Sequence, residues 1–513
     1  MNLTYFLFFI CIIVCTLIIT YWAAKQSKTA GHFYTTAGSL TGIQNGMAIA
    51  GDYISAASFL GIVGAIALNG YDGFLYSIGF LVSYLVVMFL IAEPIHHLGK
   101  YSIGDVLAAR FPSNQIRVMM AFSTFTISLL YMIPQLVAAG LLIRLMLNID
   151  YSISVLIIGG LMTVYVVFGG MIATSWVQIV KTIVLMSGTF FLSLIVFSRF
   201  SWKIPKIIEA VKAGTPLGEN FFLPGHIFDS SLELFSLQLA LILGTAGLPH
   251  ILIRLYTVKN TLEVRRSLLS ASWIIGLFYI MTLILGMGTV ALLGYDKLVA
   301  TDITGNLAAP LLAREAGGDF LMAFILAIAF TTIVAVVAGL VISATTAFSH
   351  DVYHHIIKKG ISTEKEQLWA ARWTALSIGI ISTLFALRLE NINVTFLVSL
   401  TFIVAAASNF PVLLLTIYWK RFTQTGAMIG MIAGLVSSLI LLTIGPYIMN
   451  LDGGWIHHEP LIMLYNPGII AIPLGFLGAI IGSLFTKNET TVEEMHQFQI
   501  KAQLGLKLRR ESS

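Results

Sequence analysis

The sequence predicts an all-helical membrane protein with about thirteen transmembrane helices. Hydrophobic residues make up 58% of its 513 residues and charged residues only 10%, whereas soluble domains have about 45–50% apolar and about 25% charged residues. Long stretches also lack Lys, Arg, Asp and Glu over the roughly 18 residues that a helix needs to cross a bilayer. Four such stretches are 5–22, 75–92, 273–293 and 467–485. We therefore expect one membrane domain rather than several soluble domains.

Apolar segments separated by polar ones give the order of the helices. No basic residue precedes the first segment, and Lys25 and Lys28 follow it, so we expect a retained helix rather than a signal peptide. Cys11 and Cys15 within it are interpreted as packing residues, without a disulfide or a metal site. The candidate spans are 5–22, 39–67, 74–94, 117–147, 152–169, 176–199, 231–253, 267–294, 317–349, 369–387, 394–418, 425–449 and 467–485.

The distribution of basic residues predicts the topology. If the N-terminus is outside, most Lys and Arg residues fall in the segments on the inner side, as the positive-inside rule requires. We expect a multi-pass protein of the plasma membrane with an outer N-terminus, one transmembrane domain at 1–486 and a cytoplasmic tail at 487–513. The basic residues form short blocks between spans rather than a face with aromatic side chains, which argues against a nucleic-acid partner.

Two spans carry helix-breaking residues at matching positions. The second span, 39–67, contains five glycines and the acidic residue Asp52, and the seventh contains the run Leu-Gly-Thr-Ala-Gly-Leu-Pro-His at 243–250. Each pattern alone is also typical of glycines that let helices pack closely. Because the two spans lie five apart, together they predict two inverted repeats, about 39–199 and 231–418, each opening with a helix broken near the membrane midplane.

A broken helix in a membrane predicts a binding site. Breaking the helix frees carbonyl and amide groups, which are costly to leave without partners in lipid. Unwound carbonyls therefore need a cation or water. Asp52 itself costs about 2.5–3.5 kcal/mol at the centre of a span on insertion scales, so we expect it to face the protein interior. It would serve there as a cation ligand, as a proton carrier or as a residue that orients the unwound segment.

Several long motifs, in the right order, resemble the sodium:solute symporter family and, within it, the cation/acetate symporters. The family signatures resemble 165–178 and 419–430, and the acetate branch resembles 44–61, 244–254 and 335–339 together with 349–351. This resemblance implies a leucine-transporter-like core of 5+5 inverted repeats, with one extra helix before it and two after it.

The resemblance also implies a sodium site between the second and ninth spans. Its expected ligands are backbone carbonyls and a pair of adjacent hydroxyls, from Gly51, Ile54, Ile328, Thr331 and Thr332. Without the resemblance, hydrogen bonds to the preceding turn of their own helix explain the two threonines equally well. An alignment through Asp351 would instead place Ala335 and Val336 at the site.

A small substrate is the third implication of the resemblance. The family has substrate-facing polar residues on the fourth span, and this chain has small residues where sugar-transporting relatives carry larger polar ones. The expected substrate-binding residues are Ala57, Ser58, Tyr131, Gln135, Gly247 and His250. Half-helix N-termini could hold a carboxylate there without an arginine.

The remaining charged groups near the spans receive plainer interpretations. We expect Arg254 to extend its long side chain to the cytoplasmic surface as an anchor. His350, Asp351, His354 and His355 have a spacing that a metal site would use. They stand where the ninth span leaves the membrane, next to Lys358 and Lys359, so we expect a solvated helix end there.

These observations predict a secondary active symporter and not an enzyme. It would couple the influx of sodium, or alternatively of a proton, to the uptake of a short monocarboxylate such as acetate. We expect Na⁺ as the co-transported ion, no organic cofactor, and a small organic acid and membrane lipid as partners, without an obligatory protein partner. The alternatives are a symporter for another small organic solute and a membrane sensor or regulator that keeps the symporter fold. A channel is disfavoured because no ring of charged or filter residues is present.

Overall fold

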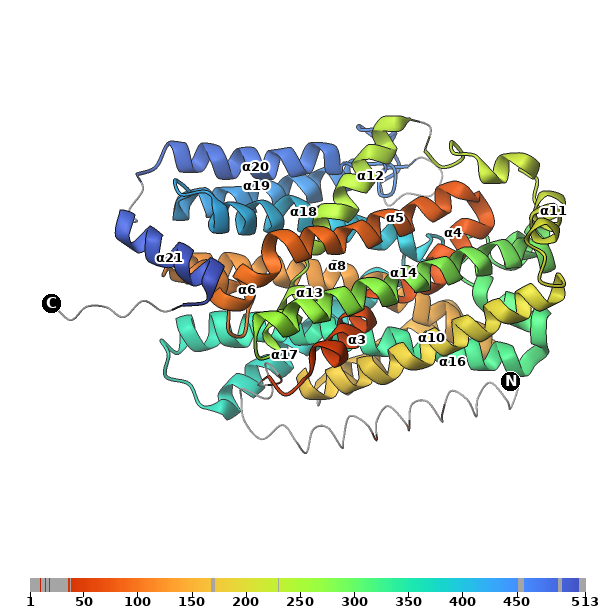
Figure 1. Cartoon of the computed structure of the whole chain (residues 1–513), viewed down its shortest axis with the longest axis horizontal. Coiled ribbons are helices and arrows are strands. Elements are labelled where there is room, and N and C mark those ends of the chain that lie inside the picture. Colours follow the sequence, from red (N-terminus) through yellow and green to blue (C-terminus); the bar gives the residue numbers. More distant parts are fainter. Residues whose placement is uncertain are drawn as a thin grey trace.

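The computed structural model describes residues 36, 38–167, 171–228, 230–450, 456–487 and 491–506, together with residues 10, 14 and 18. The expected first span, with Cys11 and Cys15, therefore lies outside the described residues apart from three positions. Figure 1 shows the described chain as a bundle of long helices that run mostly along one direction.

Within the described residues, the structure contains eight long apolar helices, two bent helix pairs and two shorter apolar helices. The all-helical membrane fold is thus confirmed, and a total of thirteen spans stays a prediction. The spanning elements are α3 (Gly42–Tyr53), η1 (Ala57–Gly61), α4 (Ile62–Asn69), α5 (Tyr71–Val86), η2 (Val87–Ile91), α6 (Ala92–Leu98), α8 (Asn114–Leu147), α9 (Tyr151–Val167), α10 (Met171–Arg199), α12 (Ser231–Gly244), η4 (Thr245–Gly247), α13 (Pro249–Leu252), η5 (Ile253–Tyr256), α14 (Thr261–Leu292), α16 (Ala308–Thr346), η6 (Ala347–Ile357), α17 (Glu364–Ala386), α18 (Val394–Tyr418), α19 (Gln424–Thr443) and α20 (Gly468–Leu484). The remaining elements are α7 (Ile103–Ala108), α11 (Ile204–Gly214), η3 (Gly218–Phe222), α15 (Tyr295–Thr301) and α21 (Val492–Leu504).

Both predicted helix breaks are present. The chain bends by 66° between α3 and η1, and by 47° between η4 and α13. At the first break Ile54 leaves helical geometry with φ −73° and ψ 89°. At the second, Leu248 is extended and Pro249 follows as the first residue of α13, a position that suits proline because it has no N–H to donate. The two bent pairs therefore open the two expected repeats.

Close backbone contacts hold the second broken helix against α18. A Cβ atom on Gly244 would lie 2.6 Å from the carbonyl oxygen of Phe402 in α18, so only glycine fits there without a shift. The last two spanning helices also pack on α18, where Gly434 of α19 and Gly475 of α20 both face the carbonyl of Ala407. α18 is thus in contact with α12, α19 and α20, and most of its residues are buried.

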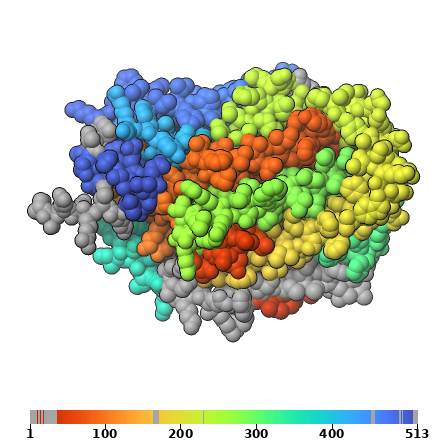
Figure 2. All heavy atoms as spheres, viewed as in Figure 1, coloured from red at the N-terminus to blue at the C-terminus, as the bar shows by residue number. Residues whose placement is uncertain are grey.

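The outer faces of the bundle are apolar. Side chains such as Phe89 and Trp273 are three-quarters exposed, at 74% and 75%, which suits contact with lipid and not with water. On the face shown in Figure 2, residues of α5, α14 and α10 form adjacent bands along the molecule. This apolar belt agrees with the membrane location that the sequence predicts.

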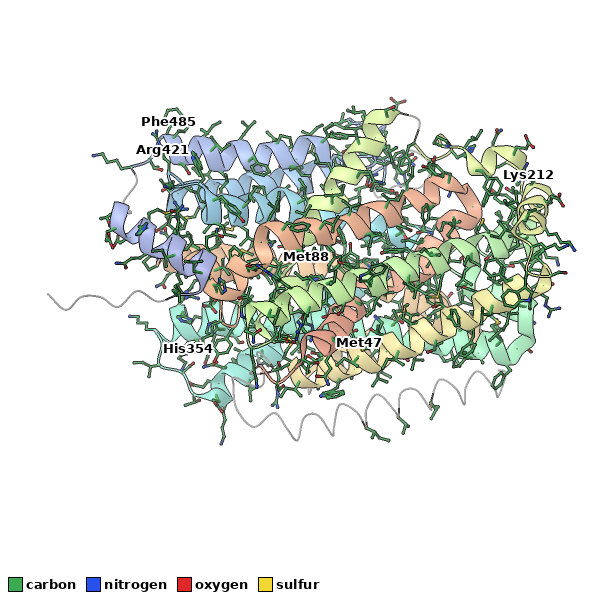
Figure 3. All side chains as sticks on the ribbon, viewed as in Figure 1. Met47, Met88, Lys212, His354, Arg421 and Phe485 are labelled. Atoms are coloured by element: carbon green, nitrogen blue, oxygen red, sulfur yellow. The ribbon has the colours of Figure 1, made fainter. Side chains whose placement is uncertain are left out.

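Segments from distant parts of the chain lie at one end of the bundle. His354, Arg421 and Phe485 lie toward the end shown on the left of Figure 3, and Lys212 lies at the opposite end. The tail helix α21 packs against α6 at the first end, with Met495, Phe498 and Ala502 buried. The tail is therefore docked on the bundle in its helical part, while its cytoplasmic location stays a prediction.

An ion-pair network at that end corrects the expectation of a solvated helix terminus. Asp351 is fully buried and accepts hydrogen bonds from Arg117 at 2.9 Å and from Ser102 at 2.9 Å. Arg117 also pairs with Asp105 at 2.8 Å. Burial opposes ionisation of Asp105, but hydrogen bonds from His350 and Arg117 hold its pKa well below the usual range. This network joins α7, α8 and η6.

Replacing Gly244 by alanine should destabilise the protein, because the added Cβ would push α12 away from α18. We expect a loss of about 1–3 kcal/mol, typical of overpacked interiors, and a lower thermal unfolding midpoint in detergent. The matched control is Gly160→Ala in α9, where a Cβ would have no neighbour within 4 Å. There alanine should leave the midpoint unchanged or raise it. Equal effects of the two substitutions would contradict the assigned α12–α18 contact.

Candidate functional site

A lysine side chain satisfies the first helix break. In a continuous helix the carbonyls of Gly51 and Ile54 would accept hydrogen bonds from amides four residues later, but the chain turns away after Tyr53. Instead the Nζ atom of Lys181, on α10, donates to both carbonyl oxygens, at 2.6 Å for Ile54. Lys181 is only 1% exposed. Its ammonium thus supplies the positive partner that freed carbonyls in lipid require.

Asp52 is the centre of a buried polar cluster beside Lys181. Its carboxylate is fully buried and accepts hydrogen bonds from Nε of Arg254 and from Nε2 of Gln178. The same Gln178 nitrogen donates to the carbonyl of Ala335 at 2.7 Å, and Arg254 Nη1 donates to the hydroxyl of Ser175 at 2.5 Å. The cluster therefore ties α3, α10, η5 and α16 together at the break.

The structure corrects the expected role of Arg254. Its side chain is 1% exposed and turns inward to Asp52 instead of reaching a membrane surface. Of the roles that the sequence left open for Asp52, orientation of the unwound segment is the one that these contacts favour. In their ordinary charge states, Lys181 and Arg254 would give the cluster two positive charges and Asp52 would give it one negative charge.

The second break is satisfied by an amide from the equivalent helix of the other repeat. Asn409 on α18 donates to the carbonyl of Gly247 at 2.8 Å, and Ser123 on α8 donates to the Asn409 oxygen at 2.6 Å. α10 and α18 are the fifth spans of their repeats. Each therefore sends a polar side chain to a carbonyl at the break that opens its own repeat.

The expected sodium ligands are only partly assembled. Gly51 and Ile54 come together at the break, whereas the hydroxyls of Thr331 and Thr332 donate to Ala327 at 3.0 Å and to Ile328 at 2.9 Å within α16. The carbonyl of Ile328 is thus used inside its own helix.

A different turn of α16 contacts the break. The carbonyl of Ala335 accepts from Gln178, and a Cβ atom on Gly339 would collide with the carboxylate of Asp52. This position corresponds to the alternative alignment, which places Ala335 and Val336 at the site. A sodium role for Ile328, Thr331 and Thr332 stays a prediction.

The expected substrate-binding residues lie close to the two breaks. Ala57, Ser58, Tyr131, Gln135, Gly247 and His250 are all buried. Gln135 accepts a hydrogen bond from the amide of Ala56 at 3.2 Å, and the rings of Tyr131 and His250 lie 5.0 Å apart. The hydroxyl of Ser58 donates to the Tyr53 carbonyl at 3.3 Å. These contacts bring η1, α8 and α13 together.

Two of these residues keep unused polar atoms. Among the described residues, Gln135 Nε2 and both ring nitrogens of His250 have no hydrogen-bond partner, although His250 is 1% exposed and Gln135 is fully buried. Leaving such groups unpaired is unfavourable, so the Gln135 amide and the N–H of the His250 ring are suited to a ligand that accepts hydrogen bonds. The substrate role of this set stays a prediction.

Sequence reasoning missed the side chains that satisfy the breaks. Lys181 is a charged residue inside a predicted span. The free-energy cost of placing a charge in a span, which indicated a role for Asp52, applies equally to Lys181. Gln178 stood within a family motif and Asn409 inside the eleventh span. Nothing in the local sequence indicates which carbonyl each of them meets.

The chain is similar to a known protein family and to a bacterial protein of the same length. The sodium:solute symporter family matches residues 33–434 of the chain. An uncharacterized symporter of Bacillus subtilis (strain 168), YwcA, is 55% identical over 513 residues, which cover 100% of both chains.

Two solved structures are similar in fold. A Na⁺-coupled sialic acid symporter in a substrate-bound outward-open state has a TM-score of 0.75 at 17% identity, over 94% of this chain and 98% of that chain. Mhp1, a nucleobase-cation-symport-1 family transporter in a closed conformation with bromovinylhydantoin bound, has a TM-score of 0.54 at 12% identity, over 91% and 97%. These likenesses confirm the inverted-repeat fold.

Removing the charge of Asp52 should destabilise the protein strongly. Asp52→Asn leaves the buried Arg254 guanidinium without its anion, a change that typically costs about 3–5 kcal/mol. The double variant Asp52→Asn, Arg254→Gln removes both charges and should recover part of that loss. Thermal unfolding of the four proteins in detergent measures the coupling.

Glu219→Gln is the matched control, because it breaks an ion pair with Lys212 in which Glu219 is exposed. It should leave the unfolding midpoint unchanged. A double variant that loses as much stability as the two single variants added together would show that Asp52 and Arg254 do not depend on each other.

Proposed function

Because the chain belongs to the sodium:solute symporter family, we propose that it is a secondary active symporter that couples cation influx to the uptake of a short monocarboxylate. One observation carries the choice of substrate. Unpartnered polar nitrogens of Gln135 and His250 are buried beside the two helix breaks, with excess positive charge nearby. A carboxylate accepts hydrogen bonds from such N–H groups, which are stronger when one partner is ionised.

The charge of the surrounding cluster supports an anionic substrate. Arg254 lies one helical turn after His250, and it shares the cluster with Lys181 and a single acid, Asp52. In a site of low dielectric constant an excess positive charge attracts an anion much more strongly than it would in water. Neutral or cationic solutes would gain nothing from this arrangement.

The walls of the site support a short substrate. The ring of Phe402 lies 6.1 Å from that of Tyr131 and 6.2 Å from that of Tyr53. Ser58, whose hydroxyl already donates to a backbone carbonyl, also accepts from Tyr279 at 3.3 Å. Aromatic and small side chains of this kind suit a few apolar carbon atoms, and they leave no free hydroxyl at Ser58 for a sugar.

Membership of the family supports sodium as the coupling cation, with a proton as the alternative. The breaks occur at equivalent places in the two repeats, so rocking of the repeats about a central site would give alternating access. Both substrate and cation would then bind in the middle of the membrane.

Uptake of labelled acetate into vesicles that contain the purified protein tests this proposal. We expect accumulation under an imposed inward cation gradient and competition by other short monocarboxylates. Gln135→Leu removes one N–H donor to a charged group, worth about 1.5–3 kcal/mol. It should raise the half-saturating acetate concentration by about 10- to 150-fold.

The control Gln115→Leu changes the same residue type on the same helix, at an exposed position, and should leave uptake unchanged. Absence of saturable uptake of any short monocarboxylate under both sodium and proton gradients would refute the proposed function. Similar uptake by the Gln135 variant and the wild type would remove Gln135 from the site.

A further inference from the structure

The expected sodium position at the first break is already occupied by the ammonium group of Lys181. The carbonyls of Gly51 and Ile54, which the sequence resemblance assigns to sodium, both accept hydrogen bonds from the ammonium of Lys181. Lys181 reaches them from α10 and is 1% exposed. A hard cation and an ammonium compete for the same oxygen atoms, since both require electron-rich partners. The two cannot occupy this position together.

The surroundings are also short of oxygen ligands for a metal ion. Hard cations such as Ca²⁺ and Mg²⁺ collect about six or more oxygen ligands. The turn of α16 at the break offers Ala335 and Gly339, which have no side-chain oxygen, and the Ala335 carbonyl is already bonded to Gln178 at 2.7 Å. On α10, the Oε1 atom of Gln178 has no partner, and the hydroxyl of Thr182 beside Gly51 donates to the Met47 carbonyl at 3.0 Å. With the carbonyls of Gly51 and Ile54 held by Lys181, these two atoms fall short of six ligands.

The charge balance disfavours a second cation. Lys181 and Arg254 already outnumber the single buried carboxylate of Asp52, which accepts from Arg254 and Gln178. His250, Tyr131 and Tyr84 are further titratable side chains near Arg254 or Asp52, and none of them supplies a compensating negative charge. A sodium ion would therefore enter a cluster that is positive before it arrives.

We infer that the ammonium of Lys181 is a covalently held cation that fills this place, and that sodium does not bind between α3 and α16 while Lys181 is present. The inference rests on the proposed function, because it names the cation at the site of the proposed symporter. The inference also goes beyond the proposed function, since a sodium gradient cannot be coupled through a position that a side chain of the protein occupies. Lys181 then joins the broken helix to α10 as a fixed part of the mechanism.

Equilibrium binding of radioactive sodium to the purified full-length protein tests the inference. Wild type should show no saturable binding at millimolar sodium that Thr332→Ala weakens. Lys181→Met keeps much of the side-chain length but frees both carbonyls and leaves Asp52 and Arg254 balanced. It should gain saturable binding at least about tenfold tighter than wild type, and sodium should raise its unfolding midpoint. Lys181→Arg keeps the charge and should behave like wild type.

Two results would overturn the inference. One is saturable sodium binding by wild type that Thr332→Ala weakens, which would place the ion at the threonines of α16. The other is a folded Lys181→Met protein that gains no sodium binding. If Lys181→Met does not fold, Lys181→Gln takes its place, and the wild-type measurement decides by itself. Failure of the proposed function is recognised separately, because acetate uptake would then be absent under every gradient, whatever the sodium-binding result.

Discussion

Peptide groups freed by breaking a helix inside a membrane must find partners within the protein, and this constraint governs the rest of the structure. The bilayer core offers no water to replace the lost hydrogen bonds. Here Lys181 supplies the partner at the first break and Asn409 at the second. Because these side chains come from equivalent helices, the same solution is used twice, once in each repeat.

The partner of the freed carbonyls at the first break, Lys181, is a charged side chain in the protein interior. A buried ammonium requires a nearby anion or several acceptors, and Asp52, whose carboxylate lies close to it, in turn engages Arg254. These successive pairings produce a cluster that links four elements and keeps an excess positive charge near the two breaks. The proposed attraction for a carboxylate and the proposed exclusion of sodium from this position would both follow from the same imbalance.

Local composition was sufficient to predict an all-helical membrane protein. A span is recognised from its own residues, because lipid selects apolar side chains all round a helix, and the boundaries drawn at 394–418 coincide with α18. The two breaks were predicted for a similar reason, since glycine and proline weaken a helix wherever they stand. In α16 the predicted start at 317 coincides with a kink at Gly317 and Gly318.

The site could be predicted only in part, because it depends on how helices pack against one another. Thr332 and Ala335 lie about one helical turn apart on a helix that is apolar along most of its length, so the sequence did not decide which turn meets the break. Arg254 was expected at a surface because Arg is long enough to reach one, but a buried acid lies closer. Lys181 was visible as a charge within a span, and only the packing of α10 against α3 showed which oxygen atoms it meets.

An experimental structure of the protein in a lipid nanodisc, determined in sodium buffer and again in sodium-free buffer, would test the central claim most directly. The account predicts an interrupted helix at Ile54 in both conditions, with the Lys181 ammonium within hydrogen-bond distance of the Gly51 and Ile54 carbonyls. An uninterrupted helix through this segment, or an ion between the two carbonyls with Lys181 turned away, would contradict it.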